Sequence, residues 1–374
     1  MALSPNEKIL NSGVLYDIDV ERSVVRLQND VVSRLNGLER QIGNALFQSE
    51  IAGYSHIGRS AANRLRRAVV AEIDEKASEA YETVGRWVDS DLRVQGAVAE
   101  NQLAGSVENS GAVDDAAAAV LVAALLTRRR REAIVADSLV EGAKIGELWR
   151  DEVDLLVMDV NRKLRSAIRS NMTNAEIISF IRGNSVAGVS EYRIGRSIGA
   201  KLREGHLYAC GVMDDKRHYA KALVRSATTA VINNVRLELM RKNSRILRGL
   251  LFVAVLDTRT TMTCRNLSGR LYDLDLRPLG HGVVLAHLPP MHVNCRSRIQ
   301  AVLLNGGDIP KDYRFDDWLA AQTEAVQKEA LGAERYKMWR RGEIRSIRDL
   351  VDQNSRPLNL DELRRKYGRR RSRG

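Results

Sequence analysis

The sequence predicts a mainly α-helical protein with long N-terminal helices, a small C-terminal α+β domain that contains a short β-sheet, and a basic tail. First, no proline occurs between Pro5 and Pro278, which favours long helices. Second, apolar residues recur every three or four positions along one predicted helix face. Third, the apolar run from Leu250 to Leu256 is typical of a buried strand. The helical stripe consists of Val24, Leu27, Val31, Leu35, Leu38, Ile42 and Leu46.

The helical pattern continues beyond this stripe. It extends over residues 59–103 and 114–172, with a break predicted at 105–111, where Gly, Ser and Asn cluster. Thr173 and Glu176 have the spacing of a capping box and open a short helix that Gly183 closes.

A long helix from Asp215 to Arg241 precedes the strand at Leu250–Leu256. A second strand is predicted at Leu271–Tyr272 and a third at Arg298–Leu304. Residues 250–305 are therefore expected to form a small sheet packed on helices, and helical periodicity returns from Phe315 onward.

Composition limits the class of protein. With 374 residues, of which 44% are hydrophobic, the chain can bury the cores of two or three domains. Three cysteines do not make a secreted disulfide framework, and the N-terminus lacks the pattern of a signal peptide, so we expect folding in a reducing cytoplasm. The longest apolar stretch, Ala116–Leu126, is about half of a membrane span, which predicts no transmembrane segment.

Basic residues concentrate at the C-terminus. The last twelve residues contain seven basic side chains and no acid, and removing them from the net charge of +12 leaves +5 on residues 1–362. Such a run is typical of a solvated arm that contacts phosphate, or of an ordinary charged terminus. The predicted nucleic-acid-binding residues are Arg364, Arg365, Lys366, Arg369, Arg370, Arg371 and Arg373.

Potential metal ligands gather in one short window. Cys264 lies 31 residues before Cys295, and His292 lies three residues before Cys295. Two thiolates and an imidazole favour zinc, and a structural zinc site needs a fourth ligand. The sequence therefore predicts a structural zinc clamp. Its predicted ligands are Cys264, His292, Cys295 and Asp257, with His287 or Cys210 as alternatives to Asp257.

Other interpretations of this window stay open. The cysteines can be small buried hydrophobic residues, with His292 bonded to a carbonyl. Alternatively, Cys264 is a nucleophile and His292 its base, although no oxyanion-forming glycine motif lies beside Cys264. A metal-dependent nuclease is a third interpretation, based on the short pattern from His292 to Asn294. Independently, the pattern from Asp257 to Thr260 favours a tight turn.

Residues in and around the window also follow a particular order and spacing. They are Asp257, Arg259, Thr260, Cys264, Gly269, Tyr272, Pro289, Pro290, His292, Asn294, Cys295 and Arg296, with Arg225–Thr228 upstream and Phe315, Trp318, Leu319, Gln322 and Pro357–Leu363 downstream. This pattern resembles the phage Mu F-like minor head (head morphogenesis) family over about residues 220–363. The chain differs from the family's common pattern at Val293, where proline is frequent, and at Ser297, where a further cysteine is frequent.

The resemblance implies a virion component of a tailed bacteriophage, present in few copies near the portal vertex. It would act in head assembly, DNA packaging or genome delivery, and no established catalytic activity accompanies it. The expected partners are the portal protein and other head proteins in a symmetric assembly. The charge of the tail, independently of the resemblance, predicts contact with double-stranded DNA through residues 363–374. The implied location is the phage head interior or portal vertex, with no membrane involved.

We accordingly expect four segments. Residues 1–215 form a long-helix region for assembly, residues 216–305 the Mu F-like α+β domain, residues 306–362 a helical extension, and residues 363–374 the basic tail. The alternatives are a metal-dependent hydrolase or nuclease that uses the Cys/His cluster, and a basic DNA-binding protein.

Overall fold

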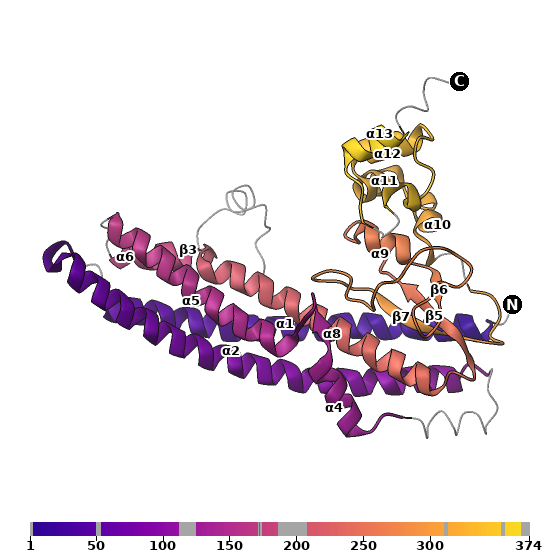
Figure 1. Cartoon of the computed structure of the whole chain (residues 1–374), viewed down its shortest axis with the longest axis horizontal. Coiled ribbons are helices and arrows are strands. Elements are labelled where there is room, and N and C mark those ends of the chain that lie inside the picture. Colours follow the sequence, from indigo (N-terminus) through magenta and orange to yellow (C-terminus); the bar gives the residue numbers. More distant parts are fainter. Residues whose placement is uncertain are drawn as a thin grey trace. The chain divides into compact units, whose positions relative to one another are not determined.

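The protein is mainly helical, with a small three-stranded antiparallel sheet in its C-terminal region (Figure 1). The computed structural model describes residues 3–49, 54–111, 125–170, 172, 174–185, 208–309, 313–352 and 356–367. Its contacts group the chain into two compact units. The helical unit comprises residues 21–92 and 136–227, and the sheet unit comprises residues 1–20, 93–135 and 228–374. The four segments expected from the sequence stay a prediction.

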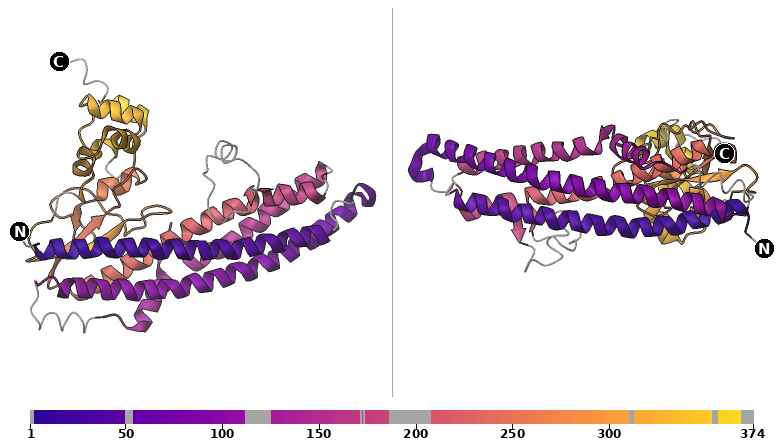
Figure 2. Two further views of the ribbon diagram at one scale, coloured as in Figure 1. Left: turned by 180° about the vertical axis from the view of Figure 1, so that it is seen from behind. Right: turned by 90° about the horizontal axis from the view of Figure 1, so that it is seen from below.

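Long helices carry most of the chain, as the scarcity of proline predicts. α2 runs back alongside α1 (Figure 2). The helices before the sheet are α1 (Pro5–Gln48), α2 (Tyr54–Glu108), α4 (Arg128–Asp137), α5 (Ile145–Arg169), α6 (Asn174–Arg182) and α8 (Val212–Lys242). Among the described residues, none of these or the later helices is long and apolar enough to cross a bilayer.

The predicted apolar stripe on α1 is confirmed as a buried face. Each of its side chains, from Val24 to Leu46, is at most 4% exposed. The stripe therefore packs inside the protein, and it is not a free surface for docking a partner.

The predicted helix over residues 114–172 is wrong at its centre. A short hairpin, β1 (Leu139–Val140) paired with β2 (Ala143–Lys144), separates α4 from α5. Glu141 and Gly142 connect the strands with φ values of 52° and 84°, a backbone conformation that a helix cannot contain. A single glycine inside an apolar pattern is a weak sequence signal for such a turn. Residues 114–124 of the predicted helix lie outside the described residues.

Two smaller predictions agree with the structure. α2 ends at Glu108, within the break expected at 105–111, and Gly111 has a φ of 74°. α6 matches the short helix predicted before Gly183, although Thr173 lies outside the described residues. After α6, β3 (Gly183–Ser185) pairs antiparallel with β4 (Tyr208–Cys210).

The three-stranded sheet has the order β6-β5-β7, and every pairing is antiparallel. The strands are β5 (Leu247–Val253), β6 (Arg270–Tyr272) and β7 (Arg298–Leu303). β5 begins three residues earlier than predicted, and a bulge lies between Leu247 and Gly249. Glycine is required at 249, because a Cβ atom there would overlap the carbonyl oxygen of Tyr272.

Helices surround this sheet in the sheet unit. α9 (Met262–Leu267) connects β5 to β6, and the helices after β7 confirm the predicted return of helical structure. They are α10 (Phe315–Ala320), α11 (Glu324–Leu331), α12 (Ala333–Arg340), η3 (Ile347–Leu350) and α13 (Leu360–Tyr367). One hydrophobic core combines β5 and β7 with α8, α9 and the loop before β7, and it contains both Cys264 and Cys295.

Candidate metal centre

Three of the four predicted metal ligands come together inside the sheet unit. The donor atoms of Cys264, His292 and Cys295 all lie within 4.8 Å of one another. Cys264 is 1% exposed and Cys295 is fully buried, whereas His292 is half-buried. This buried group could hold a metal ion.

The distances between the donor atoms suit one shared cation. The two Sγ atoms are 3.8 Å apart, and Cys264 Sγ lies 3.4 Å from His292 Nε2. Around a tetrahedral zinc ion with ordinary bond lengths, two sulfur atoms are about 3.8 Å apart, and a sulfur and a nitrogen about 3.6 Å apart. A disulfide needs about 2.05 Å between its sulfur atoms, and both cysteines are free.

The first thiol is positioned by a helix terminus. Thr261 is the N-cap of α9, and its side chain accepts a hydrogen bond from the Cys264 amide at 3.4 Å. This capping bond sets the start of the helix, and it thereby determines that Cys264 occupies the first turn. The side chain of Cys264 is then turned into the hydrophobic core rather than toward solvent.

The second thiol and the imidazole come from the loop before β7. The Cys295 amide donates to the His292 carbonyl at 3.2 Å, a turn that Asn294 permits with a φ of 66°. This turn brings the two ligand side chains to the same ion position.

α8 holds that loop through two buried side chains. Thr229 donates to the Cys295 carbonyl at 2.8 Å, and Asn233 accepts from the Ile299 amide at 2.8 Å. The Asn233 amide also donates to the Ser297 carbonyl at 3.3 Å. These bonds satisfy backbone groups that the short loop cannot pair by itself.

The tautomer of His292 is the one that a metal ligand needs. Its Nδ1 lies 2.8 Å from the Val293 carbonyl oxygen, which can only accept, so Nδ1 carries the proton. Nε2 is the ring nitrogen that faces Cys264. Metal-binding histidines commonly donate their second ring nitrogen to a carbonyl in this way, because the bond fixes the ring orientation.

The electrostatics of the group favour a cation. The hydrogen bond with Cys295, together with burial, raises the pKa of Cys264. The hydrogen bond from Cys264 lowers the pKa of Cys295 against the effect of burial, and His292 lowers it further. The hydrogen bond to Cys295 raises the pKa of His292. A thiolate is therefore favoured beside a positive charge, which is also the charge state in which a thiol binds metal.

Asp257, the fourth predicted ligand, is not part of this group. Its carboxylate accepts from the Arg296 guanidinium at 2.7 Å, from the Arg259 amide at 2.9 Å and from the Thr260 hydroxyl at 2.9 Å. The alternative interpretation of residues 257–260 as a tight turn is therefore confirmed, since Asp257 organises the turn after β5.

The alternative fourth ligands are not in the group either. His287 is exposed, and its Nδ1 bonds the Leu288 carbonyl at 2.8 Å. The side chain of Cys210 lies outside what the structure describes. Ser297 is nearer: it is 2% exposed, and its side chain acts to lower the pKa of Cys264. The site thus has a hydroxyl where the Mu F-like pattern often has a cysteine.

The predicted nucleic-acid-binding tail is described only in part. Arg364, Arg365 and Lys366 lie in the last turn of α13. Arg364 is exposed and pairs with Asp361 at 3.3 Å. Arg369, Arg370, Arg371 and Arg373 lie outside the described residues.

Sequence reasoning missed the residues that support the site. Thr229 and Asn233 lie more than fifty residues from the loop they hold, inside a helix whose apolar pattern gave no sign of such contacts. No protein-family model matches the chain, and a search of curated proteins and of solved structures finds no match either. Membership of the Mu F-like family therefore stays a prediction.

Proposed function

We propose that this protein is a minor head protein of a tailed bacteriophage, and that Cys264, His292 and Cys295 bind zinc as a structural clamp. The observation that carries the proposal is the convergence of these three donors in a buried core, in the order that the Mu F-like pattern requires. In this role the protein binds other virion components and does not turn over a substrate.

Zinc is the metal that best suits the donor set. Two thiolates and an imidazole are soft or borderline ligands, whereas calcium and magnesium prefer oxygen. The clamp joins α9 to the loop before β7, segments that are short and that have few backbone hydrogen bonds of their own. An ion that is bound by both segments would hold α9 and the loop together, which the small sheet does not do by itself.

The clamp is structural because of its surroundings. Both sulfur atoms lie in the hydrophobic core with Leu267, Tyr272 and Leu285, which leaves little room for a substrate. Zinc in such a site has four ligands, and the fourth here is a water molecule or the buried hydroxyl of Ser297.

The proposed role in the virion follows from the resemblance. The protein would lie near the portal vertex in few copies, contact the portal and other head proteins, and touch packaged double-stranded DNA with residues 363–374 through counterion release. Its long helices would supply the contact area. Because the Val24–Leu46 stripe is internal, other helix surfaces would make these contacts.

Metal analysis of the purified chain tests the clamp. We expect about one zinc ion per chain, bound tightly enough to survive gel filtration. Cys264→Ser, His292→Ala and Cys295→Ser should each reduce the zinc content to near zero, whereas the matched control Cys210→Ser should retain it. Ser297→Cys should raise the zinc affinity by supplying a third thiolate as the fourth ligand. Wild-type protein that stays zinc-free after zinc is added, with Cys264 and Cys295 both reactive as free thiols, would contradict the clamp.

The virion role needs a separate test. Quantitative mass spectrometry of purified phage particles should find the chain at a few copies per particle, and the neighbouring genes should include a portal gene immediately upstream. Absence from purified particles would exclude the head-protein proposal while leaving the zinc result intact.

A metal-dependent hydrolase or nuclease stays the second candidate. The described residues bring together three ligands, and a catalytic zinc site keeps a fourth position open for water. Zinc-dependent DNA cleavage that His292→Ala abolishes would favour this enzyme. Zinc-loaded protein without cleavage would favour the clamp.

A further inference from the structure

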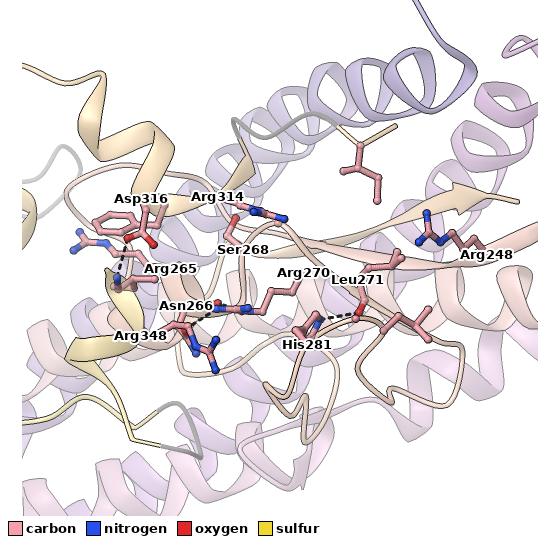
Figure 3. Close-up of a pocket in the computed structure, with 16 residues that line it drawn as sticks. Arg248, Arg265, Asn266, Ser268, Arg270, Leu271, His281, Arg314, Asp316 and Arg348 are labelled. Carbon is pink, nitrogen blue, oxygen red and sulfur yellow. Dashed lines mark hydrogen bonds between the residues drawn. The ribbon is translucent and has the colours of Figure 1, made fainter. Parts of the chain in front are cut away.

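A basic pocket lies beside the metal centre in the sheet unit, and neither the proposed clamp nor the tail uses it. The cavity has a volume of about 480 Å³ and opens between β5, β6, α9, α10 and η3 (Figure 3). Its charged lining residues are Arg248, Arg265, Arg270, Arg314, Arg348 and Asp316. Five guanidinium groups therefore surround one carboxylate.

Two of the arginines form the floor and are held in place. Arg265 is buried, donates to the carbonyls of Ala330, Asp257 and Thr258 at 2.5–3.1 Å, and stacks on the Phe315 ring at 4.7 Å. Arg270 donates to the backbone carbonyl of Asn266 at 2.5 Å and to its side-chain oxygen at 3.2 Å. None of these acceptors carries a charge, and the nearby carboxylates of Asp257 and Asp316 offset the positive charges of Arg265 and Arg270 in part.

The other three arginines stand at the rim. Arg248, Arg314 and Arg348 are exposed, and among the described residues none forms a hydrogen bond or ion pair with their guanidinium groups. The only carboxylate in the lining, that of Asp316, accepts from the Ile347 amide at 2.8 Å. The guanidinium N–H groups at the rim are thus available to a ligand. They come from three segments that are far apart in the sequence.

Neighbouring groups respond to this accumulated charge. Burial lowers the pKa of Arg270, and the charges of Arg348 and Arg314 lower it further. Burial also lowers the pKa of His281, and the charges of Arg270, Arg348 and Arg314 lower it further. The His281 ring is held neutral by its contacts, since Nδ1 accepts from the Val283 amide at 3.2 Å and Nε2 bonds the Leu271 carbonyl at 2.9 Å. Several positive guanidinium groups held this close together favour the binding of an anion between them.

We propose that this pocket binds a small ligand with adjacent phosphoryl groups, such as pyrophosphate or the polyphosphate of a free nucleotide. Guanidinium groups recognise phosphoryl oxygens through paired N–H donors, and two adjacent phosphoryl groups match a floor and rim that each carry arginines. The cavity has the size of ordinary small-molecule sites. A volume of about 480 Å³ matches a compact anion better than the backbone of duplex DNA.

This inference does not depend on the proposed clamp or on the head-protein role. The pocket residues lie between positions 248 and 348, and the basic tail begins at residue 363. Deleting residues 368–374 should therefore leave pyrophosphate binding unchanged, and that deletion separates the pocket from the arm.

Calorimetric titration of the full chain with pyrophosphate and with ATP, at constant ionic strength, tests the inference. The informative variant is Arg314→Gln/Arg348→Gln, because both side chains are exposed and the fold does not use them. The matched control is Arg245→Gln/Arg340→Gln, which removes the same charge from exposed positions outside the pocket. We expect the pocket variant to bind at least about tenfold more weakly, and the control to stay within about twofold of wild type.

Three outcomes would overturn the inference. The first is the absence of pyrophosphate and ATP binding by folded wild-type protein. The second is equal weakening in the pocket and control variants, which would indicate a general charge effect. The third is binding to duplex DNA alone. Hydrogen exchange of the pocket variant, expected to match wild type, excludes loss of folding as the cause of weaker binding.

Discussion

The helical unit and the sheet unit bury polar groups in different ways. The helical unit pairs opposite charges: Arg217 lies 2.5 Å from Glu39, and Lys216 lies 3.6 Å from Glu152, with all four side chains nearly buried. The sheet unit buries Arg236 and Arg298 with Asp17 at 3.8 Å from each, and it uses carbonyl and hydroxyl acceptors for most of their hydrogen bonds. Its Cys/His group contains no carboxylate.

This difference follows from the elements that make up each unit. Helices pair their own backbone groups, so their side chains can form ion pairs between helices. The loops around the small sheet leave backbone groups without partners of their own, and side chains from α8 pair several of them. The sheet unit should therefore depend on specific side chains and on metal, whereas the helical unit should depend on packing and charge pairs.

Removing metal should give the largest effect, and it should change the stability of the sheet unit while leaving that of the helical unit unchanged. Zinc binding to small structural sites is worth on the order of 10 kcal/mol, so a strong chelator should reduce hydrogen-exchange protection in residues 262–303 by orders of magnitude. Peptides from residues 21–92 should keep their protection. Equal loss in both units, or no loss in either, would contradict the comparison.

Breaking the buried ion pair of the helical unit should have the next largest effect. Arg217→Met removes the guanidinium that lies 2.5 Å from the buried Glu39 carboxylate, and we expect a loss of about 3–5 kcal/mol in the free energy of unfolding. The double variant Arg217→Met/Glu39→Met should recover much of that loss, because the buried Glu39 carboxylate is then removed together with the guanidinium. Urea unfolding followed by the fluorescence of Trp87 and Trp149, in a Trp318→Phe/Trp339→Phe background, measures this unit. A double variant as unstable as the single one would show that the pair is not the cause.

Asn233→Leu should destabilise the sheet unit by a smaller amount. The change removes the acceptor for the Ile299 amide, and a buried group left unpaired costs about 1–3 kcal/mol. The Ser297 carbonyl loses one of its two donors and keeps the Arg298 guanidinium at 3.1 Å. Zinc affinity should fall as well, because the loop that carries His292 and Cys295 loses its support. A variant with unchanged stability and unchanged zinc affinity would show that α8 does not position the loop.

The Asp257–Arg296 pair should give the smallest effect, visible as a pH dependence. Burial acts to raise the pKa of Asp257, but hydrogen bonds from Arg296, Thr260 and Arg259 outweigh it and lower the pKa below 3.8. The stabilisation is therefore fully present above pH 3.8 and is lost as the pH falls through the lower pKa of the folded state. Because the two side chains are 35% and 20% exposed, solvent screening should keep the effect below about 1 kcal/mol.

The pH dependence of unfolding in wild type and in Asp257→Asn measures this contribution. The stability difference between the two proteins should be constant near neutral pH and should shrink in acid. A difference that grows as the pH falls would contradict the sign of the pKa change.

The sequence by itself determined the long helices, the three strands of the β6-β5-β7 sheet and the three clustered potential metal ligands. Helices and strands bury faces that repeat along the chain, so Val24–Leu46 and the strand residues Leu250–Val253 could be recognised from neighbouring positions. Cys264, His292 and Cys295 could be recognised because few residue types bind zinc, and these three lie in one short window.

Only the tertiary structure decided the partners of those residues. Asp257 has the chemistry of a metal ligand, but its carboxylate accepts hydrogen bonds from Arg296 and from its own turn. Which of these partners the carboxylate meets depends on the folded positions of distant segments. The turn at Glu141–Gly142 interrupts an apolar pattern that predicts a continuous helix. The arginine pocket combines positions from 248 to 348 with no local pattern at all. Periodicity reports which side of an element is buried, and it carries no information about which distant segment packs there.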